Sequence, residues 1–179
     1  DRLWLRPSWE LSREGAIDVV VDPGQAFGTG AHPTTRLCLE LLCELDPAGG
    51  LIDLGTGSGV LAIAAAKLGW SPIRAYDHEP AALEAAAANA AANGVELHLE
   101  RMNLRERLPK LAPTVLANMT APILKAVAGQ LETAPSTFVC SGILPAELDA
   151  VAATFGEAGL IEAERRQEGD WAALLLRRR

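Results

Sequence analysis

Residues 51–69 read LIDLGTGSGVLAIAAAKLG, and this segment indicates the architecture of the whole chain. A short apolar run leads into three glycines at alternate positions, and an Ala-rich segment then ends at Gly69. This order is typical of a strand, a tight turn and a helix. The pattern repeats at once, because RAYD (74–77) is strand-like and Pro80 begins a second Ala-rich helix that ends at Gly94. We therefore expect parallel strands joined by helices.

The same alternation continues towards the C-terminus. Further strands are predicted over 95–100, 114–119 and 137–142, and helices over 121–131 and 145–159. The last two strand-like runs, 160–167 and 171–178, are joined by a short Gly-containing link that is typical of a hairpin. The sequence thus predicts an α/β fold, with a mostly parallel sheet between two layers of helices and a C-terminal antiparallel hairpin.

The residues before position 51 extend this unit. Residues 1–15 mix large apolar side chains with Pro7 and predict an extended lead-in, and the β-branched run at 17–24 predicts a strand and a turn. The small residues of 25–35 suit a loop, and Pro33 within this stretch can open a helix. We assign residues 16–179 to one domain. We assign 1–15 to a segment from a linker or a missing N-terminal domain, because the chain begins at Asp1 without an initiator Met.

Composition narrows the functional classes. With 179 residues, 49% hydrophobic and 22% charged, the chain suits one soluble globular domain, and charges interrupt every apolar run before it could span a bilayer. The net charge of −7 argues against non-specific nucleic-acid binding, which depends on clustered Lys and Arg. The three cysteines lack zinc-like spacing, so we expect no metal site and reduced thiols in the cytoplasm. We also expect a monomer.

The loop DLGTGSG, Asp53 to Gly59, is the first candidate for ligand binding. Ligands of open α/β sheets bind beyond the carboxyl ends of the strands, where Gly55, Gly57 and Gly59 would let the backbone approach closely. The following helix presents free N–H groups and a partial positive charge. Asp77 ends the next strand, where a carboxylate can accept hydrogen bonds from both ribose hydroxyls of a nucleoside.

Two other interpretations of this loop stay open. The glycines could simply form a tight strand-to-helix turn, or the loop could bind a dinucleotide, as in a nicotinamide-dependent oxidoreductase. The dinucleotide pattern needs a small residue three places after its second glycine, and Val60 stands there. Asp53 also suits a ligand with a cationic amino group, through direct contact or a bridging water, better than a pyrophosphate.

Four segments carry a resemblance to a known family. DLGTGSGVLAIAAAKLG (53–69) and AYDHEPAALEAAAANAAANG (75–94) resemble the class I S-adenosylmethionine-dependent methyltransferases, whose fold is Rossmann-like. DPGQAFGTGAHPTTRLCLELL (22–42) and VLANMTAPIL (115–124) resemble the bacterial ribosomal protein L11 methyltransferases. The resemblance runs from about Arg6 to the C-terminus, and FGTGAHPTT is its most specific part.

This resemblance implies a seven-stranded sheet and S-adenosylmethionine as the methyl donor. It also implies methylation of the N-terminal α-amine and of lysine ε-amines of ribosomal protein L11, with Thr34, Gly55, Asp77 and Asn118 among the cofactor contacts. The resemblance also implies that full-length members carry a small N-terminal domain that recognises the ribosomal protein, and we expect this domain to be absent from residues 1–179. An amine of another protein or of a small molecule, or cofactor binding without catalysis, are the remaining alternatives.

Asn118 is the main candidate for aligning the acceptor amine. It begins NMTAP, where amine-directed methyltransferases commonly have Asn or Asp followed by two prolines and an aromatic residue. The Asn118 oxygen and the backbone carbonyl of Met119 would accept hydrogen bonds from the amine. Met119 and Thr120 replace the prolines and the motif has no aromatic residue, which favours a flexible aliphatic amine. Alternatively, Asn118 could cap the following helix.

The loop from Phe27 to Thr35 is suited to covering the cofactor. Phe27 offers an apolar wall, and Thr34 can donate a hydrogen bond to the methionine end of the cofactor. An ordinary surface loop is the alternative. His32 is the only histidine in a plausible position for a general base, although no residue is clearly required as one.

Two further residues are weaker candidates for contacting the adenosine. His78 follows Asp77 and can flank the adenosine, and Asn103 follows the third predicted strand, where adenine lies in this fold. For Asn103, a plain turn is an equally good interpretation.

Overall fold

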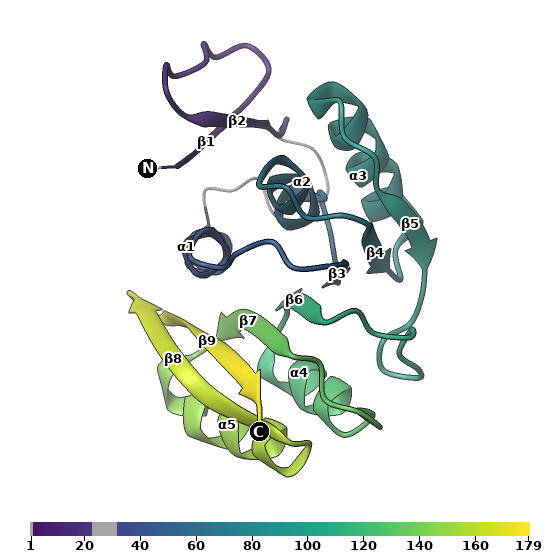
Figure 1. Cartoon of the computed structure of the whole chain (residues 1–179), viewed down its shortest axis with the longest axis vertical. Helices are drawn as coiled ribbons and strands as arrows, with labels where there is room; N and C mark the ends of the chain where they lie inside the picture. The colour runs from purple at the N-terminus through teal and green to yellow at the C-terminus, as the bar shows by residue number, and fades with distance from the viewer. Residues whose placement is uncertain (1, 23–31) are drawn as a thin grey trace.

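The computed structural model describes residues 2–22 and 32–179, and its centre is a seven-stranded sheet (Figure 1). The strands lie in the order β5 (His98–Arg101), β4 (Ile73–Asp77), β3 (Leu51–Leu54), β6 (Thr114–Asn118), β7 (Thr137–Ile143), β9 (Trp171–Arg178) and β8 (Leu160–Glu168). Neighbouring strands from β5 to β7 are parallel, whereas β9 is antiparallel to both β7 and β8. The predicted mostly parallel sheet with a C-terminal hairpin is confirmed.

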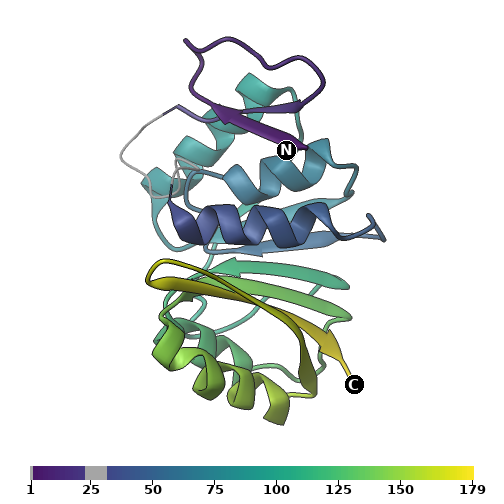
Figure 2. The ribbon, with the colours of Figure 1, turned by 90° about the vertical axis from the view of Figure 1, so that its left-hand side faces the viewer.

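Helices cover both faces of this sheet (Figure 2). One layer contains α1 (Pro33–Cys43), α2 (Val60–Lys67) and α3 (Pro80–Asn93). The opposite layer contains α4 (Ala121–Ala128) and α5 (Leu148–Glu157), the latter preceded by the short 3-10 turn η1 (Pro145–Glu147). The three-layer arrangement predicted from the alternating pattern is therefore confirmed.

Alternate residues of the central strands form two separate apolar cores. Leu116 and Val139 pack in the core beneath α1 and α2, whereas the adjacent Val115 and Phe138 pack in the core beneath α4 and α5. Because side chains alternate between the two faces of a strand, a strand covered on both sides must be apolar throughout. This explains why the sequence shows short continuous apolar runs instead of alternating polarity.

A small parallel sheet packs outside the first helical layer. Strand β1 (Leu3–Arg6) pairs with β2 (Ile17–Val20), and Arg6 forms an ion pair with Asp18. The side-chain amide of Asn93, at the end of α3, donates to the Val20 carbonyl at 2.6 Å and accepts from the Val20 N–H at 2.8 Å. The lead-in segment of 1–15 thus contributes β1, whose partner strand β2 is anchored to the main unit.

The order of the strands creates a crevice at one end of the sheet. After β5, at the edge, the chain crosses over and re-enters the sheet as β6, beside β3. The chain leaves β3 and β6 in opposite directions, towards β4 and β7, so the carboxyl ends of β3 and β6 stay uncovered. Open α/β sheets bind their ligands at such a position. Within the described residues, no helix is long and apolar enough to cross a membrane.

Candidate functional site

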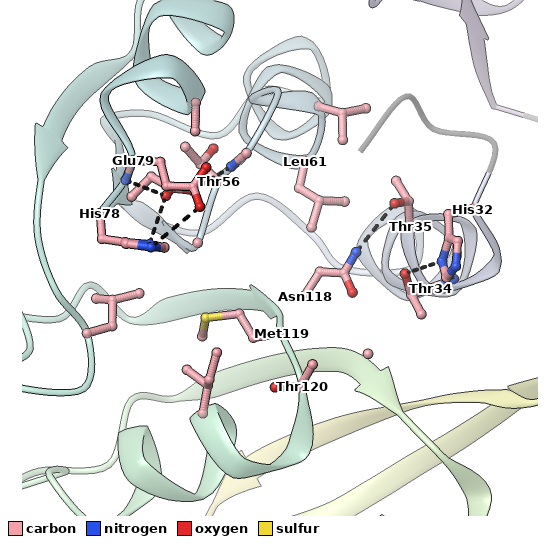
Figure 3. Close-up of a pocket in the computed structure, with 18 of the residues that line it drawn as sticks. His32, Thr34, Thr35, Thr56, Leu61, His78, Glu79, Asn118, Met119 and Thr120 are labelled. Atoms are coloured by element: carbon pink, nitrogen blue, oxygen red, sulfur yellow. Dashed lines mark hydrogen bonds and ion pairs between the residues drawn. The ribbon is translucent and has the colours of Figure 1, made fainter. Parts of the chain in front are cut away.

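A cleft of about 930 Å³ lies at the carboxyl ends of β3, β4 and β6 (Figure 3). This volume lies within the usual range for small-molecule sites. Segments far apart in the sequence line it: the start of α1, the glycine loop, the ends of β4 and β6, and the start of β9. Of the predicted site residues, those that line it are His32, Thr34, Gly55, Gly57, Asp77, His78, Asn103, Asn118 and Met119. Phe27 lies outside the described residues.

The glycine loop is held tightly against the end of β4. The N–H groups of Gly55 and Thr56 both donate to the Tyr76 carbonyl, at 2.8 and 3.0 Å. Gly55 has a φ of +71°, and a Cβ there would lie 2.8 Å from the Met119 sulfur. Asn89, on α3, donates to the Ser58 carbonyl from a buried position. Gly59 starts helix α2 but does not line the cleft. These contacts with the rest of the protein fix the shape of the loop, as a preformed cradle requires.

Asp77 faces the cleft in a fixed orientation. Its Oδ2 accepts a hydrogen bond from the Gly57 N–H and its Oδ1 from the Glu79 N–H, both at 3.0 Å. Its side chain is 11% exposed, so one side of the carboxylate is buried and the other reaches the cleft. Each carboxylate oxygen can accept more than one hydrogen bond, which leaves capacity for a pair of neighbouring hydroxyl groups.

Asp53 does not line the cleft, although it stands only two residues before Gly55. Its side chain is buried, its Oδ2 accepts a hydrogen bond from the Thr56 hydroxyl at 2.6 Å, and its Oδ1 has no partner among the described residues. Burial raises the pKa of Asp53 to about 7. The hydrogen bond from Thr56 acts in the opposite direction and lowers this pKa. The Asp53 Oδ1 is thus a buried acceptor without a partner among the described residues, and Asp53 does not reach the cleft. A water-bridged contact between Asp53 and the cationic amino group of a ligand therefore fits better than a direct contact.

The start of α1 differs from the predicted loop. Pro33, Thr34 and Thr35 form the first turn of α1, and His32 is the residue that caps it. The His32 Nδ1 lies 2.8 Å from the Thr34 hydroxyl and accepts from the Thr34 N–H. Both threonines are fully buried yet reach the cleft. The predicted opening of a helix at Pro33 is thus confirmed, whereas the loop interpretation, which extended to Thr35, was wrong for residues 33–35.

Asn118 ends β6 and turns towards α1. Its Nδ2 donates to the Thr35 hydroxyl oxygen at 3.4 Å (Figure 3). Residue Thr120, not Asn118, caps the following helix α4, so the alternative capping role of Asn118 is wrong. The Met119 N–H donates to the Ser141 carbonyl at 3.0 Å, which ties this segment to β7.

Gly142 lies directly against the Met119 backbone and also lines the cleft. Its φ is +85°, and a Cβ there would lie 2.5 Å from the Met119 carbonyl oxygen. The register between β7 and β9 shifts at this position, which marks a β-bulge. Gly142 could not be identified from the sequence, because nothing in TFVCSG (137–142) indicates a bulge before the partner strand is known.

His78 and Asn103 line the part of the cleft beyond Asp77. His78 is largely exposed, with ring nitrogens 3.4 Å from an Asp77 oxygen and 3.5 Å from a Glu79 oxygen. The Asn103 amide donates to Glu106 and accepts from the Arg105 N–H, so its side chain supports its own turn. This arrangement favours the turn interpretation of Asn103.

Trp171, at the start of β9, gives the cleft the aromatic side chain that NMTAP lacks. Its ring contacts the His32 ring edge to face, with centroids 5.1 Å apart. Tryptophans scattered along a sequence are typically packing anchors, and Trp171 does pack against the first apolar core as well as lining the cleft. Trp9 does not fit this expectation, because it is 69% exposed. No local sequence pattern indicates that the His32 and Trp171 rings meet, because the two residues are 139 positions apart.

The comparisons with known proteins agree with each other. The family model described as ribosomal protein L11 methyltransferase (PrmA) matches residues 1–179. A ribosomal protein L11 methyltransferase of Geobacter metallireducens is 44% identical, over 97% of this chain and 60% of its own length. The corresponding protein of Pelotomaculum thermopropionicum is 42% identical, over 98% and 60%. The chain thus spans about 60% of the length of these curated relatives.

Solved structures show the same fold. A ribosomal protein L11 methylase from Lactobacillus delbrueckii subsp. bulgaricus superimposes with a TM-score of 0.84 at 30% identity, covering 96% of this chain and 91% of that one. A tRNA (uracil-54, C5)-methyltransferase from Pyrococcus abyssi, in complex with S-adenosyl-L-homocysteine, has a TM-score of 0.67 at 20% identity, covering 93% and 43%. At that identity, the second likeness concerns the fold alone.

Proposed function

Because the chain belongs to the ribosomal protein L11 methyltransferase family, we propose that it transfers methyl groups from S-adenosylmethionine to amino groups of ribosomal protein L11. The target groups are the N-terminal α-amine and lysine ε-amines. The proposal includes action in the cytoplasm, as a monomer and without direct contact to nucleic acid.

One observation carries the proposal: a nucleoside-type cradle and an amide-bearing strand end line the same cleft. On one side are the glycine loop and Asp77, held by the hydrogen bond from Gly57. On the other side is Asn118, on the neighbouring strand. A methyl donor and an amine bound in this cleft would lie next to each other. The main contribution of the protein to methyl transfer would then be to align the amine with the methyl group.

The residues present fit S-adenosylmethionine. Asp77 would accept hydrogen bonds from the ribose hydroxyls, His78 and the Asn103 segment would flank the adenine, and Gly55, Thr34 and Phe27 would contact the remainder. The unpaired Oδ1 of Asp53 fits a water-bridged contact to the amino group of the methionine end. When bound, this cofactor supplies a methyl group activated by a sulfonium centre.

The acceptor amine must reach the cleft with a free lone pair. The Asn118 oxygen and the Met119 carbonyl would accept its N–H hydrogen bonds and so direct the lone pair. Deprotonation at pH 7 costs about 4.6 kcal/mol for a lysine of pKa 10.4 and about 1 kcal/mol for an α-amine of pKa 7.8. The α-amine is therefore the easier substrate.

His32 is the proposed candidate for a general base. His32 engages Thr34 and Trp171 and caps α1. These contacts give it a structural role as well as a place in the cleft, and its role as a general base stays a prediction.

The Trp171 ring can attract the ammonium group that methyl transfer produces. A protonated or methylated amine attracts an aromatic ring through the cation–π interaction. Trp171 lines the same cleft as Asn118, so it would contact the amine or its alkyl chain.

The test combines binding with mass spectrometry of the acceptor. Calorimetric titration should show binding of S-adenosylhomocysteine and none of NAD. Incubation with S-adenosylmethionine and isolated ribosomal protein L11 should add multiples of one methyl mass at the N-terminus and at lysines. Binding of NAD instead would favour the oxidoreductase alternative. Binding without any transfer, also by a form extended to the length of the relatives, would contradict the enzymatic proposal.

A further inference from the structure

Thr35 occupies an unusual position for a fully buried helical side chain. It lies in the first turn of α1, lines the cleft, and its hydroxyl oxygen accepts the Nδ2–H of Asn118 at 3.4 Å. The two residues are 83 positions apart in the chain. Figure 3 shows the Asn118 amide nitrogen turned towards Thr35 and its oxygen turned away from it.

Both partners of this hydrogen bond are held by backbone structure. The Thr35 N–H donates to the His32 carbonyl at 3.0 Å, within the capped first turn of α1. As a β-branched residue in a helix, threonine has few side-chain rotamers. Asn118 is paired with Ser141 in the sheet, and the next N–H, that of Met119, bonds to the same residue. The Thr35 hydroxyl oxygen therefore has a fixed position, from which it can orient the Asn118 side-chain amide.

The orientation of the amide decides which of its ends can meet an amine. An asparagine side chain has an oxygen that accepts and a nitrogen that donates. Only the oxygen can accept an N–H of the acceptor amine and leave the lone pair of that amine directed at the methyl group. An amide turned around would direct its own N–H groups at that lone pair and compete with the reaction.

From this geometry we propose that Thr35 is a positioning residue for methyl transfer, acting through Asn118. Its hydroxyl holds the amide nitrogen, which leaves the Asn118 oxygen for the substrate amine. The proposal rests on the proposed function for its chemistry, whereas the hydrogen bond itself can be tested without any substrate. Thr35 need not touch the substrate or the cofactor.

The kinetic test uses Thr35→Val, Thr35→Ser and Thr114→Val. Valine keeps the branched shape and removes the hydroxyl, serine restores the hydroxyl, and Thr114→Val removes a buried hydroxyl at the opposite end of β6. We expect Thr35→Val to lower kcat about tenfold, the equivalent of one hydrogen bond of about 1.4 kcal/mol. The affinity for S-adenosylhomocysteine should change less than twofold, and Thr35→Ser and Thr114→Val should stay near the wild type.

A double-mutant cycle separates positioning from a general structural effect. In the Asn118→Ala background, Thr35→Val should have no further effect on kcat, because the side chain through which it acts is gone. An unchanged kcat in Thr35→Val, a parallel loss of kcat and cofactor affinity, or full additivity with Asn118→Ala would each overturn the proposal.

A nuclear magnetic resonance measurement keeps this proposal distinct from the proposed function. In the wild type, the side-chain amide of Asn118 should give resolved signals with slowed hydrogen exchange, and Thr35→Val should shift them and accelerate exchange. Identical amide signals in both proteins would overturn the role of Thr35, whether or not the chain methylates ribosomal protein L11. If the amide signals behave as predicted but no methyl transfer is detected, the proposed function alone is overturned.

Discussion

Single residues in this cleft are positioned mainly by backbone groups. Asp77 is held by two N–H donors, and the Met119 carbonyl is confined by Gly142. Asn118 depends on one side-chain hydroxyl, that of Thr35. Residues oriented in this way need no rearrangement when a ligand enters, so substitutions should separate cofactor binding from amine alignment.

Asp77 should dominate cofactor affinity. Asp77→Ala removes the proposed ribose acceptor, and it also leaves the N–H groups of Gly57 and Glu79 without their partner. We expect the binding free energy of S-adenosylhomocysteine to weaken by about 2–3 kcal/mol, the scale of charge-assisted hydrogen bonds. Calorimetric titration measures this, with the exposed Asp46→Ala as the control. Equal affinity of Asp77→Ala and the wild type would remove Asp77 from the ribose site.

Asp53 should make stability depend on pH in an unusual direction. Burial raises its pKa in the folded state to about 7, whereas an unfolded aspartate has a pKa of about 3.9. Between these values the folded state binds more protons, so this carboxyl contributes a loss of stability as pH rises from about 4 to 7.

Asp53→Asn should remove this pH dependence. Relative to the wild type, the variant should gain stability as pH rises from 4 to 7, by an amount on the order of a few kcal/mol, and then level off. Urea denaturation at several pH values gives the difference, with Asp46→Asn as the exposed control. Parallel stability curves for Asp53→Asn and the wild type would show that the Asp53 pKa is not raised.

At the scale of elements, the cleft depends on where strands end and helices begin. The β7 bulge brings Gly142 against the Met119 backbone, and the capped start of α1 brings Thr35 to Asn118. Neither contact is local in sequence. Each is produced by the order of the strands, which places β6 and β7 side by side beneath α1.

Gly142→Ala should disturb both stability and transfer. The added Cβ would lie 2.5 Å from the Met119 carbonyl, at a φ of +85°. The backbone must therefore shift, and we expect a loss of several kcal/mol of stability together with a lower kcat. Gly169→Ala is the matched control, because Gly169 also has a positive φ, +57°, but nothing within 4 Å. That control should cost only about 1–2 kcal/mol. Equal costs for the two variants, measured by chemical denaturation, would contradict the close contact of Gly142 with the Met119 carbonyl.

At the scale of the whole molecule, periodicity predicted the layers well, because buried parallel strands and Ala-rich helices leave strong local patterns. The glycine loop, Asp77 and Asn118 were also found, since they end strands whose positions the pattern gives. Thr35, Gly142 and Trp171 were missed, because their roles depend on contacts between residues that only the folded sheet brings together. The helix opening at Pro33 was predicted, but the loop inferred from the small residues of 25–35 also covered Thr34 and Thr35, which belong to α1.

Cofactor binding should also stabilise the entire fold. A ligand that binds only the folded state at 100 times its Kd adds about 2.7 kcal/mol of stability. For a chain of this size that corresponds to a rise in Tm of about 5–10 °C. Differential scanning calorimetry with S-adenosylhomocysteine should show this rise, and NAD at the same concentration should leave Tm unchanged. A rise with NAD alone would indicate a dinucleotide site.

The account is tested most directly by a crystal structure of this chain with S-adenosylhomocysteine. It should show both ribose hydroxyls within hydrogen-bonding distance of the Asp77 carboxylate, the homocysteine part against the glycine loop, and the sulfur facing the oxygen of Asn118. A nucleoside bound outside the cleft, or one whose ribose makes no contact with Asp77, would contradict it.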